Sequence, residues 1–337
     1  MAGIQKLLFV DANIWLDLYR QRQSGAAMEV LTKLEQIKDK IIATHVLEME
    51  YKKNRQLAIA EGLASLKNPA PVATHGIFSN VKAAKALETK MRASKKHLAT
   101  LRERLIKALE DPTHHDPVYK TCQRIFRKSD GLVLGVDSDR RIKAQVRSKA
   151  IRRFYLGCPP RKAGDTSLGD AINWEWMVRC AEEHQAELVI LTRDTDYGPT
   201  IENKLYLNDH LKQEFKARVS KKRNVLLYSS ASQALKHFEV KVSKETEKSE
   251  SQFITEVTPA MQAASAARQA LANFNSDFLV QLRAAMASQK EEQAAMAARI
   301  RQFLGTTYYG PQSTSVRDEA APESTDPATA DDEPGSK

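Results

Sequence analysis

The sequence has few cysteines, no long hydrophobic run and a modest share of aromatic residues. Its three cysteines in 337 residues are odd in number and far apart, which argues against a disulfide framework or a zinc knuckle. No apolar stretch approaches the roughly 20 residues that a membrane helix needs. The first 15 residues lack a basic region and a small-residue cleavage site, so no signal peptide is expected. These absences predict a cytoplasmic protein that does not bind a membrane.

Positive charge is present, and it is concentrated in one part of the chain. The whole chain has a formal charge of +10, whereas residues 81–162 alone hold 22 Lys or Arg and 8 Asp or Glu, a net of +14. Residues 311–337 hold seven acids and two bases, a net of −5. A surplus confined to one segment favours a polyanionic partner, although a solvated helical face would also explain it.

Strands and helices alternate on both sides of this basic segment. Short apolar runs predict buried strands at 6–10, 40–43, 187–192 and 224–228. Amphipathic or capped stretches predict helices at 13–37, 44–63, 168–184, 208–219 and 230–238. This alternation is typical of a doubly wound parallel α/β sheet flanked by helices.

The remaining segments predict attachments to this sheet domain, which we place at residues 1–240. After a loop over 67–80, residues 81–153 are expected to form a basic helical insertion, with helices at 81–111, 118–128 and 139–153. A charged linker over 241–257 would lead to an Ala-rich helix over 258–304, suited to self-association or a protein partner. Residues 305–337 have the composition of an acidic, disordered tail.

Four acids fall where a doubly wound sheet places its ligands, near the carboxyl ends of its strands. Asp11 and Asp194 follow predicted strands, whereas Asp170 and Glu50 lie on adjacent helices. Clustered carboxylates repel one another, and a divalent cation relieves that repulsion. Oxygen ligands without His or Cys favour Mg²⁺ or Mn²⁺, which can support phosphodiester hydrolysis. Taken singly, each acid could instead be a helix cap, a first-turn acid, a turn residue or a surface residue.

Four strings in the same order, FVDANIWLDLYR, THVLEMEYKKNRQ, GDTSLGDAINWEWMV and LVILTRDTDYG, resemble the PIN domain. The match is closest to the group whose second acid lies in an E-[FY]-x-x-N-R string, and it covers roughly 4–60 and 154–240. The family usually has a smaller and less basic middle segment. The resemblance implies a metal-dependent ribonuclease with a catalytic acidic cluster of Asp11, Glu50, Asp170 and Asp194. It also implies Asp196 as a further metal ligand and Asn13, Thr192 and Asp165 as residues that position the carboxylates.

The same reading predicts a nucleic-acid interface, with RNA or another single strand as the partner. The candidate phosphate-binding residues near the acids and along the basic segment are Arg55, Lys95, Lys96, Arg102, Arg104, Arg161, Lys162 and Arg193. Such an enzyme would act as an endoribonuclease in a toxin or antiviral defence role.

Three other functions compete with this interpretation. A flap-type DNA nuclease would use the basic insertion as a helical arch, but the expected helix-hairpin-helix glycine motif is not visible. A non-catalytic RNA-binding module would have an incomplete set of acids, whereas all four are present here. A phosphatase of the haloacid dehalogenase type needs a second Asp two residues after the first, and Asn13 occupies that position.

Overall fold

The computed structural model describes residues 4–21, 25–68, 77, 81–161, 167–202, 204–256, 291, 294–296 and 298. The chain divides into two units, residues 1–273 and 274–337. The predicted Ala-rich helix and acidic tail lie outside the described residues, except for residues 291, 294–296 and 298, which are helical. No helix within the described ranges has the length and apolar character needed to cross a membrane.

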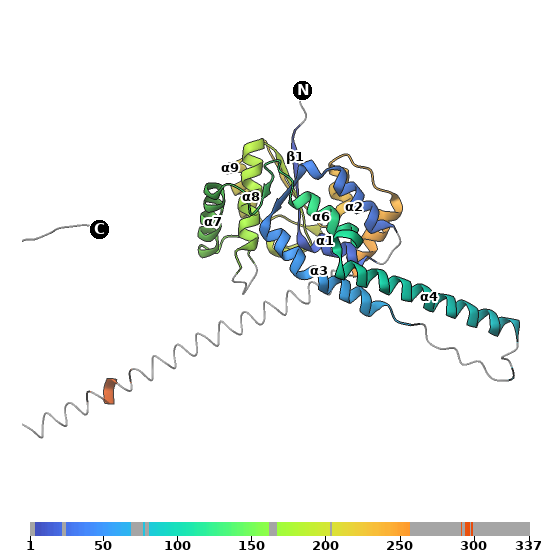
Figure 1. The fold of residues 1–337 in the computed structure, drawn as a ribbon. Helices are drawn as coiled ribbons and strands as arrows, with labels where there is room; N and C mark the ends of the chain where they lie inside the picture. Colours follow the sequence, from blue (N-terminus) through green and yellow to red (C-terminus); the bar gives the residue numbers. More distant parts are fainter. Residues whose placement is uncertain are drawn as a thin grey trace, which may run out of the picture. The chain divides into compact units, whose positions relative to one another are not determined.

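A five-stranded parallel sheet forms the centre of the first unit (Figure 1). Its strand order is β3-β2-β1-β4-β7, and every neighbouring pair runs parallel. The strands are β1 (Lys6–Val10), β2 (Ile41–Thr44), β3 (Val133–Leu134), β4 (Glu187–Leu191) and β7 (Val225–Tyr228). Helices cover the central strands on both faces, which explains why the runs at β1 and β4 are almost continuously apolar. The predicted doubly wound α/β fold is confirmed.

The first helical segment is divided where the sequence predicted one helix over 13–37. Helix α1 (Ala12–Arg20) ends at Gln21, whose extended backbone leaves the helix. Helix α2 (Ala26–Gln36) begins after Gly25, which has a φ of +88°. That left-handed conformation is inexpensive only for glycine, so the chain turns there and starts a new helix. A short 3₁₀ turn, η1 (Lys38–Lys40), then leads into β2.

The helix after β2 begins where the sequence predicted. Thr44 caps α3 (His45–Ser65) by accepting a hydrogen bond from the backbone N–H of Leu47 at 3.0 Å. Helix α4 (Lys82–Glu110) covers the predicted range 81–111. It extends from the body of the domain beside the end of α3, and Ala108 is its only buried residue (Figure 1).

The rest of the basic insertion is not the wholly helical subdomain that the sequence predicted. Helices α5 (Pro112–His115), α6 (Pro117–Phe126) and α7 (Arg140–Tyr155) are present, but β3 lies between α6 and α7 and pairs with β2. Phe126 contacts Trp15 and Tyr51 edge to face, with ring centroids 6.1 and 6.0 Å apart. Since β3 completes the sheet and α6 contributes to its core, only α4 projects as a separate basic arm.

The second half of the domain follows the predicted alternation with one addition. Helix α8 (Gly169–His184) precedes β4, and α9 (Asp209–Arg218) and α10 (Ala231–His237) flank β7. Between β4 and α9 lie a 3₁₀ turn, η3 (Thr195–Tyr197), and an antiparallel pair that the sequence did not predict, β5 (Thr200–Ile201) and β6 (Lys204–Leu205).

The segment predicted as a charged linker over 241–257 is instead docked on the domain. Residues 244–256 are helical. Glu250 is fully buried and accepts hydrogen bonds from the hydroxyl of Ser230 and the backbone N–H groups of Ala231 and Ser232. It therefore caps the positive end of α10, which gives a buried carboxylate the donors it needs. We call residues 244–256 the docked segment.

Candidate functional site

Asp11 lies at the carboxyl end of β1 and begins α1. Its backbone N–H donates to the carbonyl of Leu191 in β4, which holds the two strand ends together at 3.0 Å. One carboxylate oxygen accepts from the backbone N–H of Ala12 at 2.7 Å, so Asp11 is the N-cap of α1. The capping role that the sequence left open as an alternative is real, but it occupies only one of the two oxygens.

Two side chains hold the other oxygen of Asp11 at the same edge. Thr192 donates to it from its hydroxyl at 2.6 Å, and Asn13 donates from its amide at 2.9 Å. Asn13 also donates to the Thr192 hydroxyl at 3.1 Å, and this hydroxyl accepts from the backbone N–H of Asp194 at 3.0 Å. The structure thus brings Asn13 and Thr192 to Asp11, and it ties the start of the Asp194 turn to the same network.

The electrostatics of Asp11 place the other predicted acids around it. Burial, chiefly, and then the negative charges of Asp194, Glu50 and Asp170 raise its pKa well above the usual range, against the hydrogen bond from Thr192. These charges act on Asp11 from the turn after β4, from α3 and from the start of α8, so the four acids face one edge of the sheet. The acid at position 165 lies outside the described residues.

Tyr197 is a member of this edge that sequence analysis missed. Its side chain is buried, and burial together with the charges of Asp170, Asp11, Asp196 and Asp194 raises its pKa well above the usual range. Asp196, the preceding residue, lies near the Tyr197 ring, whereas the acids that raise the pKa of Asp11 do not include it. A single tyrosine in a turn gives no periodic signal, and only its position directly after TRDTD could have drawn attention to it.

The turn after Tyr197 is fixed by a close backbone approach. The Tyr197 carbonyl accepts from the backbone N–H of Asn208 at 2.8 Å, just before α9 begins. At Gly198, a Cβ atom would lie 1.8 Å from the carbonyl oxygen of Tyr206, so only glycine fits. We call the sheet edge that carries Asp11, Glu50, Asp170 and Asp194 the acidic edge. Through Tyr197, this edge is hydrogen-bonded to the residue that precedes α9.

The carboxylate oxygens of these acids suit a hard divalent cation, although the side chains of the described residues do not form a complete coordination shell. Within the described ranges, no group of three or more His, Cys, Asp or Glu side chains is close enough to hold a metal ion. Mg²⁺ commonly keeps several waters and takes only one or two protein carboxylates, so a loose set of oxygen donors fits it. The pKa of Asp11 is raised by burial and by neighbouring acids, and a cation would stabilise the ionised form of this carboxyl.

Two arginines predicted to bind phosphate form ion pairs inside the protein. Arg55 is buried and donates to Asp116 at 2.7 Å and to the carbonyl of Ala108. Arg193 is buried, pairs with Asp17, and lies 5.1 Å from the ring of Phe253 in the docked segment. Each guanidinium neutralises a buried carboxylate and could bind a phosphate only by leaving that carboxylate without its partner, so phosphate binding by either arginine stays a prediction.

The other predicted phosphate-binding residues face solvent where they are described. Arg161 is exposed and stacks on Phe154, with 4.4 Å between the guanidinium carbon and the ring centroid. The four arm cations Lys95, Lys96, Arg102 and Arg104 are exposed along α4. The lysine at position 162 lies outside the described residues. The arm as a whole carries nine Lys or Arg and three Glu, a net charge of +6.

Comparison with known proteins identifies one family. The family model described as PIN domain matches residues 8–197, which is more than half of the chain and runs from within β1 to the end of η3. No curated protein and no solved structure matches the chain. The family match indicates a nuclease-type function and a nucleic-acid substrate.

Proposed function

The chain belongs to the PIN-domain family, and from that premise we propose that it is a metal-dependent endonuclease that cleaves RNA. One observation carries the proposal: the pKa of Asp11 is raised by burial and then by the charges of the acids at positions 194, 50 and 170, so all four acids face the same edge of the sheet. Carboxylates placed in this way repel one another, and a bound divalent cation would relieve that repulsion.

Asp11, Glu50, Asp170 and Asp194 would hold one or two Mg²⁺ or Mn²⁺ ions, with Asp196 as a further ligand. A bound ion supplies an activated water at neutral pH and neutralises charge that develops on the phosphate. Within the protein, Thr192 and Asn13 keep one Asp11 oxygen fixed by their two hydrogen bonds. They would act as positioning residues, orienting the ligand without touching the substrate.

The exposed cations of the α4 arm would bring the substrate to this edge. An acidic cluster repels phosphates, so a nuclease needs positive charge nearby, and the arm supplies a net of +6. The choice of RNA rests on the motif resemblance, which implies ribonuclease chemistry. A toxin or defence role in the cytoplasm would follow from cleavage of cellular RNA, and expression of the active chain would then arrest growth.

Incubation with labelled substrates tests the proposal directly. Single- and double-stranded RNA and DNA are incubated with Mg²⁺, Mn²⁺ or EDTA, and the products are resolved by length. We expect internal cleavage of RNA with either metal and none in EDTA or with Asp194→Asn. Cleavage that persists equally in EDTA would contradict the metal-dependent mechanism.

The projecting arm favours one alternative, a flap-type DNA nuclease that threads a strand beneath a basic helix. The same assay separates the two, because a flap nuclease would cut branched DNA at the junction and leave linear RNA intact. That result would overturn the choice of RNA while keeping the acidic edge as the active site.

A further inference from the structure

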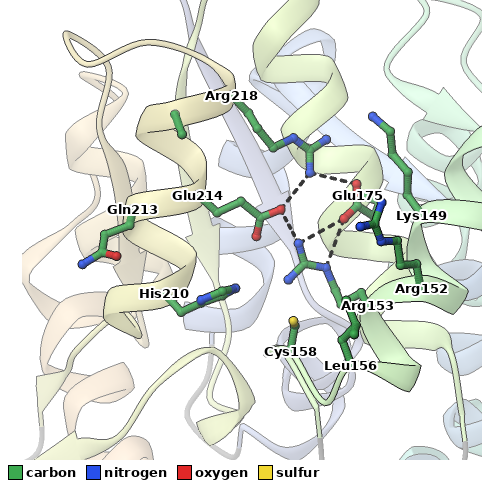
Figure 2. A pocket seen from close by; sticks show the side chains of 11 residues that line it. Lys149, Arg152, Arg153, Leu156, Cys158, Glu175, His210, Gln213, Glu214 and Arg218 are labelled. Carbon is green, nitrogen blue, oxygen red and sulfur yellow. Dashed lines mark hydrogen bonds and ion pairs between the residues drawn. The ribbon is translucent and has the colours of Figure 1, made fainter.

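A pocket outside the acidic edge lies between α7, α8 and α9 (Figure 2). Its cavity has a volume of about 670 Å³, which is large enough for a nucleotide. Four cationic and two acidic side chains line it: Lys149, Arg152, Arg153, Arg218, Glu175 and Glu214.

The two acids are fully engaged by two of the arginines. Arg153 donates to Glu175 at 3.0 Å and also pairs with Glu214. Arg218 donates to the second oxygen of Glu175 and to Glu214, both at 2.9 Å. Figure 2 shows these four side chains joined across the pocket. This network fixes the floor of the pocket and leaves it electrically balanced.

The surplus charge belongs to the two cations at the rim. Lys149 and Arg152 are exposed, lie one turn apart on α7, and form no ion pair with any described residue. A pocket with a balanced floor and two uncommitted cations at its rim is suited to an anionic ligand. An apolar ligand would displace water from the charged side chains of the floor without replacing the hydrogen bonds of that water.

One element connects this pocket to the acidic edge. It is not α8, because Asp170 at its start and Glu175 five residues later are about 7.5 Å apart along the axis but roughly 140° apart around it, so their side chains leave the helix on different sides. Helix α9 begins just after Asn208, which is bonded to Tyr197 at the acidic edge, and His210 in its first turn lines the pocket. The start of α9 therefore lies between the two sites, and a strand bound at the acids would pass it to reach the pocket.

An exposed aromatic side chain lies beside the rim. Tyr155, at the end of α7, is 83% exposed, and its neighbour Leu156 lines the pocket. Cations that follow a backbone, together with an aromatic ring on which a base can stack, are the recurring features of sites for single-stranded nucleic acid.

We infer that this pocket is a second binding site for the substrate strand, in which Lys149 and Arg152 hold phosphates of a single-stranded segment next to the one at the acidic edge, while Tyr155 stacks on a base. The inference rests on the proposed nuclease function, but it concerns binding and not cleavage.

Binding in EDTA tests the inference without any cleavage. The affinity of a fluorescent 12-nucleotide RNA is measured across a range of salt for the Lys149→Gln/Arg152→Gln variant. The matched control is Arg140→Gln/Arg147→Gln, which removes two exposed cations from the same helix outside the pocket. We expect the pocket variant to bind about 5- to 10-fold more weakly at about 0.1 M salt and its salt slope to fall by about 1.4, from roughly 0.7 per lost phosphate contact. The control should keep the salt slope of the natural chain. Tyr155→Ala should weaken binding but leave the salt slope unchanged.

A thiol inside the pocket reports whether RNA occupies it. Cys158 lines the pocket and is partly exposed, whereas Cys122 and Cys180 are buried. RNA in EDTA should therefore slow alkylation of Cys158 several-fold in the natural chain and much less in the pocket variant. Equal salt slopes in the pocket variant and its control, or RNA binding that leaves Cys158 unprotected, would overturn the inference.

Competing ligands distinguish a phosphate of an RNA strand from a small phosphate ligand in the pocket. Protection of Cys158 by inorganic phosphate or a nucleoside monophosphate, but not by RNA, would overturn the strand assignment in favour of a small phosphate ligand. RNA that protects Cys158 but is never cleaved with metal would retain the binding site and refute the proposed nuclease. The two failures are thus distinguishable.

Discussion

The acidic edge and the α4 arm hold charge in opposite ways. At the edge, Asp11 and Thr192 are buried, and their oxygens are fixed by hydrogen bonds from the backbone and from Asn13. Along the arm, Ala108 is the only buried residue and the cations project into solvent. The edge therefore specifies atomic positions, whereas the arm supplies charge without fixed geometry. A change at the edge should alter a reaction sharply, and a change on the arm should alter attraction gradually.

The largest effect is expected from removing one charge at the edge. Asp11→Asn or Asp194→Asn should lower nuclease activity roughly 100-fold or more, because even the outer partners of metal ligands affect metal affinity or activity 10- to 100-fold. Unfolding should stay cooperative, since loss of a charge relieves repulsion among the acids that raise the Asp11 pKa. The matched control is Asp209→Asn, an exposed acid at the start of α9. Full activity in both edge variants would remove this edge as the active site.

Replacing Arg55 tests whether this cation stabilises the fold, as the buried groups of the edge do, or binds the substrate, as the exposed cations of the arm would. Arg55→Ala would leave Asp116 buried and without its cation, which should lower the free energy of unfolding by about 3 kcal/mol. Chemical denaturation measures this loss, with Lys53→Ala, an exposed residue on the same helix, as the control. A variant that keeps its stability but raises KM would support the predicted role of Arg55 in phosphate binding.

The difference between edge and arm also explains what the sequence could predict. Asp11 and Asp194 were placed together because each follows an apolar run, and the carboxyl ends of parallel strands meet at one edge. The α4 helix was visible from its periodicity. The ion pair of Arg55 could not be predicted, because its partner, Asp116, lies 61 residues away, and sequence spacing gives no sign of that pairing.

Two errors have the same origin in long-range contacts. Strand β3 has only two residues, too few for a pattern, and it exists because β2 offers an unpaired neighbour. The docked segment was predicted as a linker because charged composition usually means solvation. Its Glu250 is buried only because the N-terminus of α10 provides three hydrogen-bond donors, which no local pattern reveals.

The docked segment is a third charged region. Its sequence is charged like that of the arm, but its Glu250 is buried and hydrogen-bonded like Asp11 at the edge. Glu250→Ala should lower the free energy of unfolding by about 2 kcal/mol, because it leaves backbone donors of α10 unsatisfied in a buried place. Truncation after Val242 should destabilise the domain at least as much, whereas truncation after Glu256 should not. Thermal unfolding of the two truncated chains measures the difference. Equal melting temperatures would mean that the segment contributes nothing to the domain.

The smallest effect is expected on the arm, and it should appear in binding and not in chemistry. Replacing Lys95, Lys96, Arg102 and Arg104 with Gln should raise KM about 5-fold and leave kcat nearly unchanged, because exposed cations attract the substrate without touching the reacting phosphate. If all four contact phosphates, the salt slope should fall by about 2.8, from roughly 0.7 per contact with a single strand.

The control for the arm removes the same charge elsewhere. Lys212, Lys216, Lys221 and Lys222 are exposed at and after α9, and none lines the pocket. Their replacement with Gln changes the net charge equally, so any effect of total charge on binding appears in both variants. A larger loss of salt dependence in the arm variant would locate the attraction on α4. Equal losses would show that net charge alone attracts the strand, and the arm would then be a solvated helix without a binding role.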